Sequence, residues 1–324
     1  MKTHVASLPV FATLIVAGSS ALVSRAAFAG APPSTSTDGS AAQGKGPIAF
    51  TPAVAPIPDD EFGKVVRKGR EIFDDPGKYA SEYVGSNLMR CTSCHLDEGR
   101  QPGAAPMWAA YGAYPAYRSK NHHVNTFEER LQGCFRFSMN GKAPPFNDPV
   151  LVALESYSYW MSKGAPIDEK LKGRGYPKLA KPASPPDYQR GAQIYAQDCA
   201  LCHGSHGEGR VARDGQPDFP ALWGAESFNW GAGMGSITNA AAFIRANMPR
   251  GRGGMLSEQE AWDVATFMDS QERPQDPRYT GSVADTRAKY HNGASSMYGK
   301  VVNGHLLGSD SEASGGRLRQ SMSP

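Results

Sequence analysis

The sequence is poor in cysteine and almost balanced in charge. It has five cysteines in 324 residues, and 34 Lys and Arg residues stand against 31 Asp and Glu residues, a formal net charge of +3. An odd number of cysteines excludes a fold held only by paired disulfides, because at least one thiol is left over. A charge balance so close to zero argues against a nucleic-acid-binding protein, which needs a clustered basic excess.

Long apolar runs are absent beyond the first 29 residues. Lys2 precedes a largely apolar stretch at 8–23, and an A-x-A cleavage pattern ends at Ala29. This pattern predicts a signal peptide cleaved after Ala29 and a periplasmic protein with no membrane span after cleavage; the alternative is a retained membrane anchor. Removal of Lys2 and Arg25 lowers the formal charge from +3 to +1.

Alternating apolar runs long enough to form a sheet are also absent, whereas apolar residues at helical spacing recur along the chain. A serine-led capping box at 257–260 marks the start of the last strong helix. The expected helices are 59–73, 126–139, 149–163, one that opens at Asp187, and 257–271. We therefore expect an all-α fold with long glycine-rich loops.

The chain contains an internal repeat. The segment KGREIF at 68–73 resembles RGAQIY at 190–195, and each precedes a cysteine cluster. Four prolines among Lys, Gly and Ser at 173–186 are typical of a linker between two domains. The predicted organisation is a signal peptide at 1–29, a flexible leader at 30–58, domains at 59–172 and 187–275 joined by the linker 173–186, and an extension at 276–324 that is disordered from about 309.

Each predicted domain carries one C-x-x-C-H motif, at 91–95 and at 199–203. Two thiols one helical turn apart can form thioethers with the vinyl groups of one porphyrin, and the adjacent histidine can bind its iron. The motifs predict two covalently bound haem c groups attached through Cys91, Cys94, Cys199 and Cys202, with His95 and His203 as proximal ligands. A zinc site is disfavoured because its second cysteine pair usually follows after about 15–20 residues. Here the pairs lie 108 residues apart.

Each haem iron also needs a ligand on its other face. For the second haem, Met248 is the best candidate because it lies in a loop nine residues before the capped helix, with Met234 and Met255 as alternatives. For the first haem, the repeat favours Met139, but Cys134 lies only five residues upstream. On spacing alone, Met139 and Cys134 are nearly equal candidates for the ligand of the first haem iron.

Cys134 is the cysteine that haem attachment leaves over. It is either a buried inert thiol, an iron ligand or a sulfur nucleophile. The last two roles need a thiolate, which nearby cations stabilise. The basic residues closest in sequence are Arg118, Lys120, Arg130, Arg136 and Lys142.

At this point the sequence resembles the thiosulfate dehydrogenases, a family of periplasmic dihaem cytochromes c that couple two thiosulfates into tetrathionate. The resemblance runs from about 59 to 308. It rests on the separation of the two haem motifs and on the segments 133–142, 247–249, 256–264 and 276–278.

The resemblance implies that Cys134 is the axial ligand of the first haem, opposite His95, and that catalysis occurs there. It implies His203 and Met248 as ligands of the second haem; Asn247 replaces a lysine that binds iron in some members, so a lysine-to-methionine ligand switch is not expected. Thiosulfate is a dianion, so a basic pocket is needed. The residues assigned to substrate binding are Arg118, Arg130, Arg136 and Lys142, with Ser138 as a hydrogen-bond donor.

Electrons would pass from the first haem to the second and on to a soluble c-type cytochrome or similar acceptor. The couple is reversible in principle, so tetrathionate reduction is open as well. Two other functions remain as alternatives: a passive dihaem electron carrier, and the haem subunit of a multi-enzyme sulfur-oxidising system. The lone Cys134 beside basic residues favours an enzyme over a passive carrier.

Overall fold

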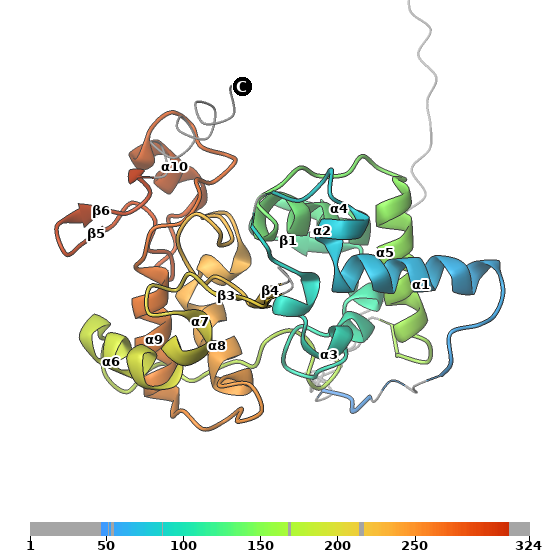
Figure 1. The fold of residues 1–324 in the computed structure, drawn as a ribbon, viewed down its shortest axis with the longest axis horizontal. Helices are drawn as coiled ribbons and strands as arrows, with labels where there is room; N and C mark the ends of the chain where they lie inside the picture. The colour runs from blue at the N-terminus through green and yellow to red at the C-terminus, as the bar shows by residue number, and fades with distance from the viewer. Residues whose placement is uncertain are drawn as a thin grey trace, which may run out of the picture. The chain divides into compact units, whose positions relative to one another are not determined.

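The computed structural model describes residues 47–50, 52, 55–85, 87–167, 170–213 and 217–310, which are mainly helical (Figure 1). The predicted signal peptide, most of the leader and the tail from 311 lie outside these residues. The α-helices are α1 Glu61–Asp74, α2 Pro76–Tyr79, α3 Leu96–Gly99, α4 Phe127–Gly133, α5 Pro149–Met161, α6 Tyr188–Asp198, α7 Ala200–His203, α8 Ile237–Asn247, α9 Glu258–Asp269 and α10 Val283–Tyr290. Short 3₁₀ turns and a π-helix are Cys91–Ser93, Met107–Ala109, Tyr111–Ala113, Gly233–Gly235 and, in the π form, Cys134–Ser138.

The strands of the described chain form only small antiparallel pairs, so the expectation of a mainly helical fold is confirmed. Each pair is a two-stranded hairpin of two or three residues per strand. The pairs are β1 Ala116–Arg118 with β2 His123–Asn125, β3 Arg210–Val211 with β4 Pro217–Phe219, and β5 Val301–Val302 with β6 His305–Leu306.

The internal repeat appears as two equivalent helix pairs, α1 against α5 and α6 against α9 (Figure 1). The glycine of each repeat lies where the two helices approach most closely. A Cβ added at Gly69 would lie 2.0 Å from the carbonyl oxygen of Ala153, and one at Gly191 would lie 2.1 Å from that of Asp263. Only glycine allows the two backbones to approach so closely. The repeat therefore encodes a helix crossing.

The predicted helix starts are confirmed, although one predicted helix changes type along its length. Asp60 Oδ1 accepts a hydrogen bond from Gly63 N at 2.8 Å, and Ser257 forms the capping box with Glu260. The segment predicted as one helix at 126–139 is α-helical to Gly133 and then widens into the π-helix. Helices α8 and α10 were not expected from the sequence.

The part of the extension that the structure describes packs against the second half of the chain. Tyr298 and Leu307 form a buried cluster with Trp230. Asp276 accepts hydrogen bonds from His291 Nε2 at 2.9 Å and from Arg278 Nη2 at 2.6 Å. Burial alone would raise the pKa of this carboxyl, but these two partners hold it well below its usual range.

Across the part of the chain that the structure describes, none of the helices is long and apolar enough to span a bilayer.

Candidate functional site

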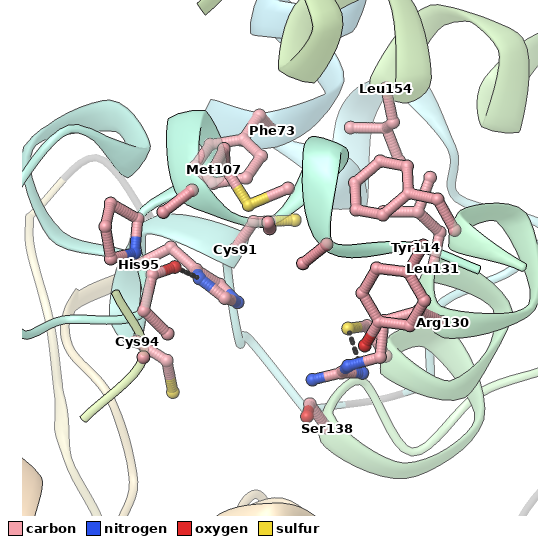
Figure 2. A pocket seen from close by; sticks show the side chains of 18 of the residues that line it. Phe73, Cys91, Cys94, His95, Met107, Tyr114, Arg130, Leu131, Ser138 and Leu154 are labelled. Atoms are coloured by element: carbon pink, nitrogen blue, oxygen red, sulfur yellow. Dashed lines mark hydrogen bonds between the residues drawn. The ribbon is translucent and has the colours of Figure 1, made fainter. Parts of the chain in front are cut away.

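The first C-x-x-C-H motif opens onto a mostly apolar cavity that encloses about 1130 Å³ of empty space, including its open mouth. Cys91, Cys94 and His95 line one part of its wall, and both Cys134 and Met139 line another. In Figure 2, the labelled side chains of the motif lie on one side of the pocket, while those of α4 and Ser138 lie on the other. Both sulfur candidates for the first haem therefore reach the same cavity.

The second motif opens onto a larger cavity that encloses about 1790 Å³ of empty space, including its open mouth, and is lined by Cys199, Cys202 and His203. Met248 and Met234 also line it. Met255 does not belong to the lining, and 38% of it is exposed. The structure therefore reduces the three methionine candidates for the second haem to two.

Both histidines are oriented as metal ligands usually are. His95 Nδ1 donates to the carbonyl oxygen of Ala105 at 2.6 Å, and His203 Nδ1 donates to that of Pro220 at 2.9 Å. These bonds fix the tautomer and leave Nε2 as the nitrogen that can bind iron. Burial also lowers the pKa of His203, which favours the neutral imidazole that a metal requires.

The donor sets fit a c-type haem in each cavity. Each combines a pair of thiols, an imidazole whose Nδ1 is held by a backbone carbonyl, and a further sulfur side chain around a mostly apolar space. Met89, Arg90 and Cys94 line both cavities, so a single layer of residues separates them.

Cys134 differs electrostatically from the cysteines of the haem motifs. Its Sγ accepts a hydrogen bond from Arg130 Nη1 at 3.0 Å. Burial alone would raise the pKa of the Cys134 thiol, but the Arg130 guanidinium, together with His95, lowers it to about 6. Burial without such a partner raises the pKa of the Cys94 and Cys199 thiols to about 12. The surroundings of Cys134 therefore favour its thiolate, whereas those of Cys94 and Cys199 favour the neutral thiol.

Three of the five predicted substrate-binding side chains reach this cavity. Arg118, Arg130 and Ser138 line it, and Arg118 Nη1 also donates to the Tyr114 hydroxyl at 3.1 Å. Arg136 and Lys142 are exposed and do not line the cavity. Residues two apart on a helix face different directions, so Arg136 does not share the side of Cys134.

Two cations outside the predicted set gather beside the π-helix. The Lys120 ammonium donates to the Gly231 carbonyl and lies 4.2 Å from the Phe137 ring centroid, and the Arg278 guanidinium lies 4.9 Å from the same centroid. Much of Lys120 is exposed, but its ammonium group is buried. This burial is the main reason why the pKa of Lys120 is lowered to about 7, and the positive charges of Arg278 and Arg130 contribute less. The segment 276–278 of the family resemblance was the available signal for Arg278. Arg174 also lines the cavity, and no motif or spacing in the sequence points to it.

Comparison with known proteins identifies the family. Residues 78–167 match the family described as "SoxA/TsdA, cytochrome c domain", and residues 186–268 match that described as "Cytochrome C oxidase, cbb3-type, subunit III". A thiosulfate dehydrogenase of Thiomonas intermedia is 60% identical over 278 residues, which cover 86% of this chain and 87% of the relative. The chain belongs to the thiosulfate dehydrogenase family.

Further thiosulfate dehydrogenases agree with this membership. That of Stutzerimonas stutzeri is 54% identical over 254 residues, covering 78% of this chain and 82% of the relative. The structure of thiosulfate dehydrogenase TsdBA from Marichromatium purpuratum, in its as-isolated form, matches with a TM-score of 0.77 and 48% identity over 80% of this chain. The match spans 57% of that longer chain. The two cytochrome c domains of this family member imply that it binds haem c, in agreement with the two cavities.

Proposed function

We propose that this protein is a thiosulfate dehydrogenase that joins two thiosulfates into tetrathionate at the first cavity. The observation that carries the proposal is the 3.0 Å contact between Arg130 Nη1 and Cys134 Sγ in the cavity of the first haem motif. A passive electron carrier does not need a charge-stabilised thiolate beside its haem. The relatives named thiosulfate dehydrogenase support the same activity.

Two covalently bound haem c groups would be held by residues already placed around the cavities. His95 and Cys134 would bind the first iron, and His203 and Met248 would bind the second. Bound haem supplies one-electron acceptors, one at each site. Met139 then packs in the core of the first domain, where it is 3% exposed.

Cys134 would act as a nucleophilic sulfur. In the first step its thiolate and the sulfane sulfur of one thiosulfate form a sulfur–sulfur bond, and two electrons are released. In the second step the sulfane sulfur of another thiosulfate attacks the substrate sulfur of this adduct. Tetrathionate leaves, and Cys134 is again a thiolate. Two thiosulfate dianions thus give one tetrathionate dianion and two electrons.

Arg118, Arg130 and Ser138 would hold the sulfonate groups. Two dianions repel each other, and guanidinium groups offset this repulsion because they pair with oxyanions through charge-assisted hydrogen bonds. Arg130 has a second task, since the same guanidinium stabilises the Cys134 thiolate.

Electrons would leave through the second domain to a soluble c-type cytochrome in the periplasm. The cavities share Met89, Arg90 and Cys94, so the groups bound in them are neighbours and need no intermediate carrier. Export through the predicted signal peptide at 1–29 would place the enzyme in the same compartment as its acceptor.

Purified holoenzyme with thiosulfate and ferricyanide tests the function. We expect one tetrathionate for every two ferricyanide reduced, without any added protein. The family description that matches 78–167 also names SoxA, which keeps the sulfur-oxidising haem subunit as a second candidate. No tetrathionate from the purified enzyme, and turnover only after a sulfur-carrier protein is added, would contradict the dehydrogenase and favour that candidate.

A further inference from the structure

The π-helix that carries Cys134 leaves several of its carbonyl groups without partners of its own. Inside this segment, Met139 N donates to the Cys134 carbonyl at 3.0 Å, and Gly141 N donates to the Phe135 carbonyl at 2.9 Å. The carbonyl groups of the next three residues, 136–138, lie at the end of the helix, where no further N–H group of the helix backbone can donate to them. Unpaired carbonyls in a partly buried segment are costly, so their partners determine how firmly the segment is held.

Donors from outside the helix complete this end. Asn229 Nδ2 donates to the Arg136 carbonyl at 2.9 Å, and Asn229 N donates to the Phe137 carbonyl at 3.2 Å. Asn87 Nδ2 donates to the Ser138 carbonyl at 3.0 Å. Asn229 therefore supplies two of the three bonds, although it lies 95 residues after Cys134, in the segment predicted as the second domain.

The Asn229 side chain has no polar atom left for another role. Besides the Arg136 carbonyl, its Nδ2 donates to Asn140 Oδ1 at 3.0 Å, and its Oδ1 accepts from Gly231 N at 3.0 Å. Only 1% of the residue is exposed. An amide is the neutral side chain of this size that offers two donors and an acceptor together.

We propose that Asn229 is a positioning residue for Cys134: the second domain, through this one side chain and its backbone, holds the π-helix that presents the catalytic sulfur. The inference rests on the proposed role of Cys134. The loop that carries Asn229 continues to Met234 in the wall of the second cavity. The predicted second domain, which would receive the electrons, would thus also fix the position of the π-helix that carries Cys134.

Asn229→Asp in the holoenzyme is the sharpest test. It keeps the size and the acceptor for Gly231 N, but it places a carboxylate oxygen opposite the Arg136 carbonyl and Asn140 Oδ1. We expect kcat for thiosulfate oxidation to fall on the order of 10- to 100-fold, since a small displacement of a reacting group has effects of this size. KM should change less than kcat, because Arg118 and Arg130, which lie outside the π-helix, are untouched.

Spectroscopy separates positioning from general damage. The electron paramagnetic resonance and near-infrared bands that report thiolate ligation of a ferric haem should weaken or become heterogeneous, while those of the second haem stay as in the wild type. Asn87→Ala, which removes the bond to the Ser138 carbonyl, should shift the same signals if Asn229→Asp does not yield folded protein. Asn239→Ala is the matched control, because Asn239 is only partly buried and its Nδ2 donates to the Gly233 carbonyl at 2.8 Å, outside this helix.

The outcomes separate this inference from the proposed function. A wild-type holoenzyme without a thiolate signature overturns the Cys134 assignment, and the inference with it. A wild type with that signature, and folded Asn229→Asp and Asn87→Ala variants with unchanged spectra and kcat, overturn the inference and leave the proposed function intact. An equal effect of Asn239→Ala on the thiolate signature also counts against it.

Discussion

Replacement of Arg130 by glutamine tests the electrostatic basis of the site. The Arg130 guanidinium lies 3.0 Å from Cys134 Sγ and, together with His95, outweighs the effect of burial on the pKa of the thiol. Without this charge, burial should raise the pKa of Cys134 toward the value of about 12 that it gives Cys94. A hydrogen bond to a charged group contributes about 1.5–3 kcal/mol. Since each 1.4 kcal/mol is tenfold, Arg130→Gln should lower kcat/KM about 10- to 150-fold.

The assay is steady-state oxidation of thiosulfate with ferricyanide, after haem content and spectra confirm that both groups are attached. Arg130→Lys keeps the charge but loses the planar fork, so it should recover part of the activity. Arg136→Gln is the control, because Arg136 has the same charge, lies two residues from Cys134 and is exposed outside the cavity. A kcat/KM for Arg130→Gln within about twofold of the wild type would show that the Arg130 charge does not control the reactivity of Cys134.

Three further predictions concern packing, pH and the second haem. Gly69→Ala should destabilise the protein by about 1–3 kcal/mol in denaturant unfolding, because its Cβ would overlap the facing helix. Asp276→Asn should lose about 1.5–3 kcal/mol of stability at pH 7. Because the pKa of Asp276 is lowered by folding, its contribution is present above the unfolded pKa of about 3.9 and is lost as the pH falls, so the gap to the wild type should narrow in acid. Met248→Ala should lower the midpoint potential of one haem, since methionine ligation raises it, whereas Met255→Ala should not.

Each of these predictions has its own control. Gly112→Ala should leave stability nearly unchanged, because no atom lies within 4 Å of its added Cβ. A stability gap for Asp276→Asn that widened as the pH fell would reverse the expected sign. Unchanged midpoint potentials in Met248→Ala would contradict Met248 as the haem ligand and favour Met234, which is the other methionine of the second cavity.

Local chemistry made much of the site predictable from the sequence. The C-x-x-C-H spacing, the Ser257–Glu260 capping box and the repeated glycine at 69 and 191 are each specified within a few residues. The odd cysteine drew attention to Cys134 because four of the five thiols already had a role. Helix α8 was missed because its run of alanines at 240–242 gives little contrast between a buried and an exposed face.

The remaining features depend on contacts between distant segments. Spacing placed Arg136 beside Cys134, but the helix turns its side chain to the surface. Arg278 and Lys120 meet over Phe137 only after the chain folds. Asn229 carries no motif, and its partner carbonyl at Arg136 lies 93 residues away in the sequence. A π-helix also cannot be distinguished from an α-helix by apolar spacing over five residues.

The proposed function depends on the formation of tetrathionate at Cys134. Cys134→Ala, purified with both haems attached, tests it directly by the rate of tetrathionate formation from thiosulfate and ferricyanide beside the wild type. We expect Cys134→Ala to lose nearly all turnover, with the spectrum of the second haem unchanged. Full turnover by the Cys134→Ala holoenzyme would contradict the formation of tetrathionate at Cys134.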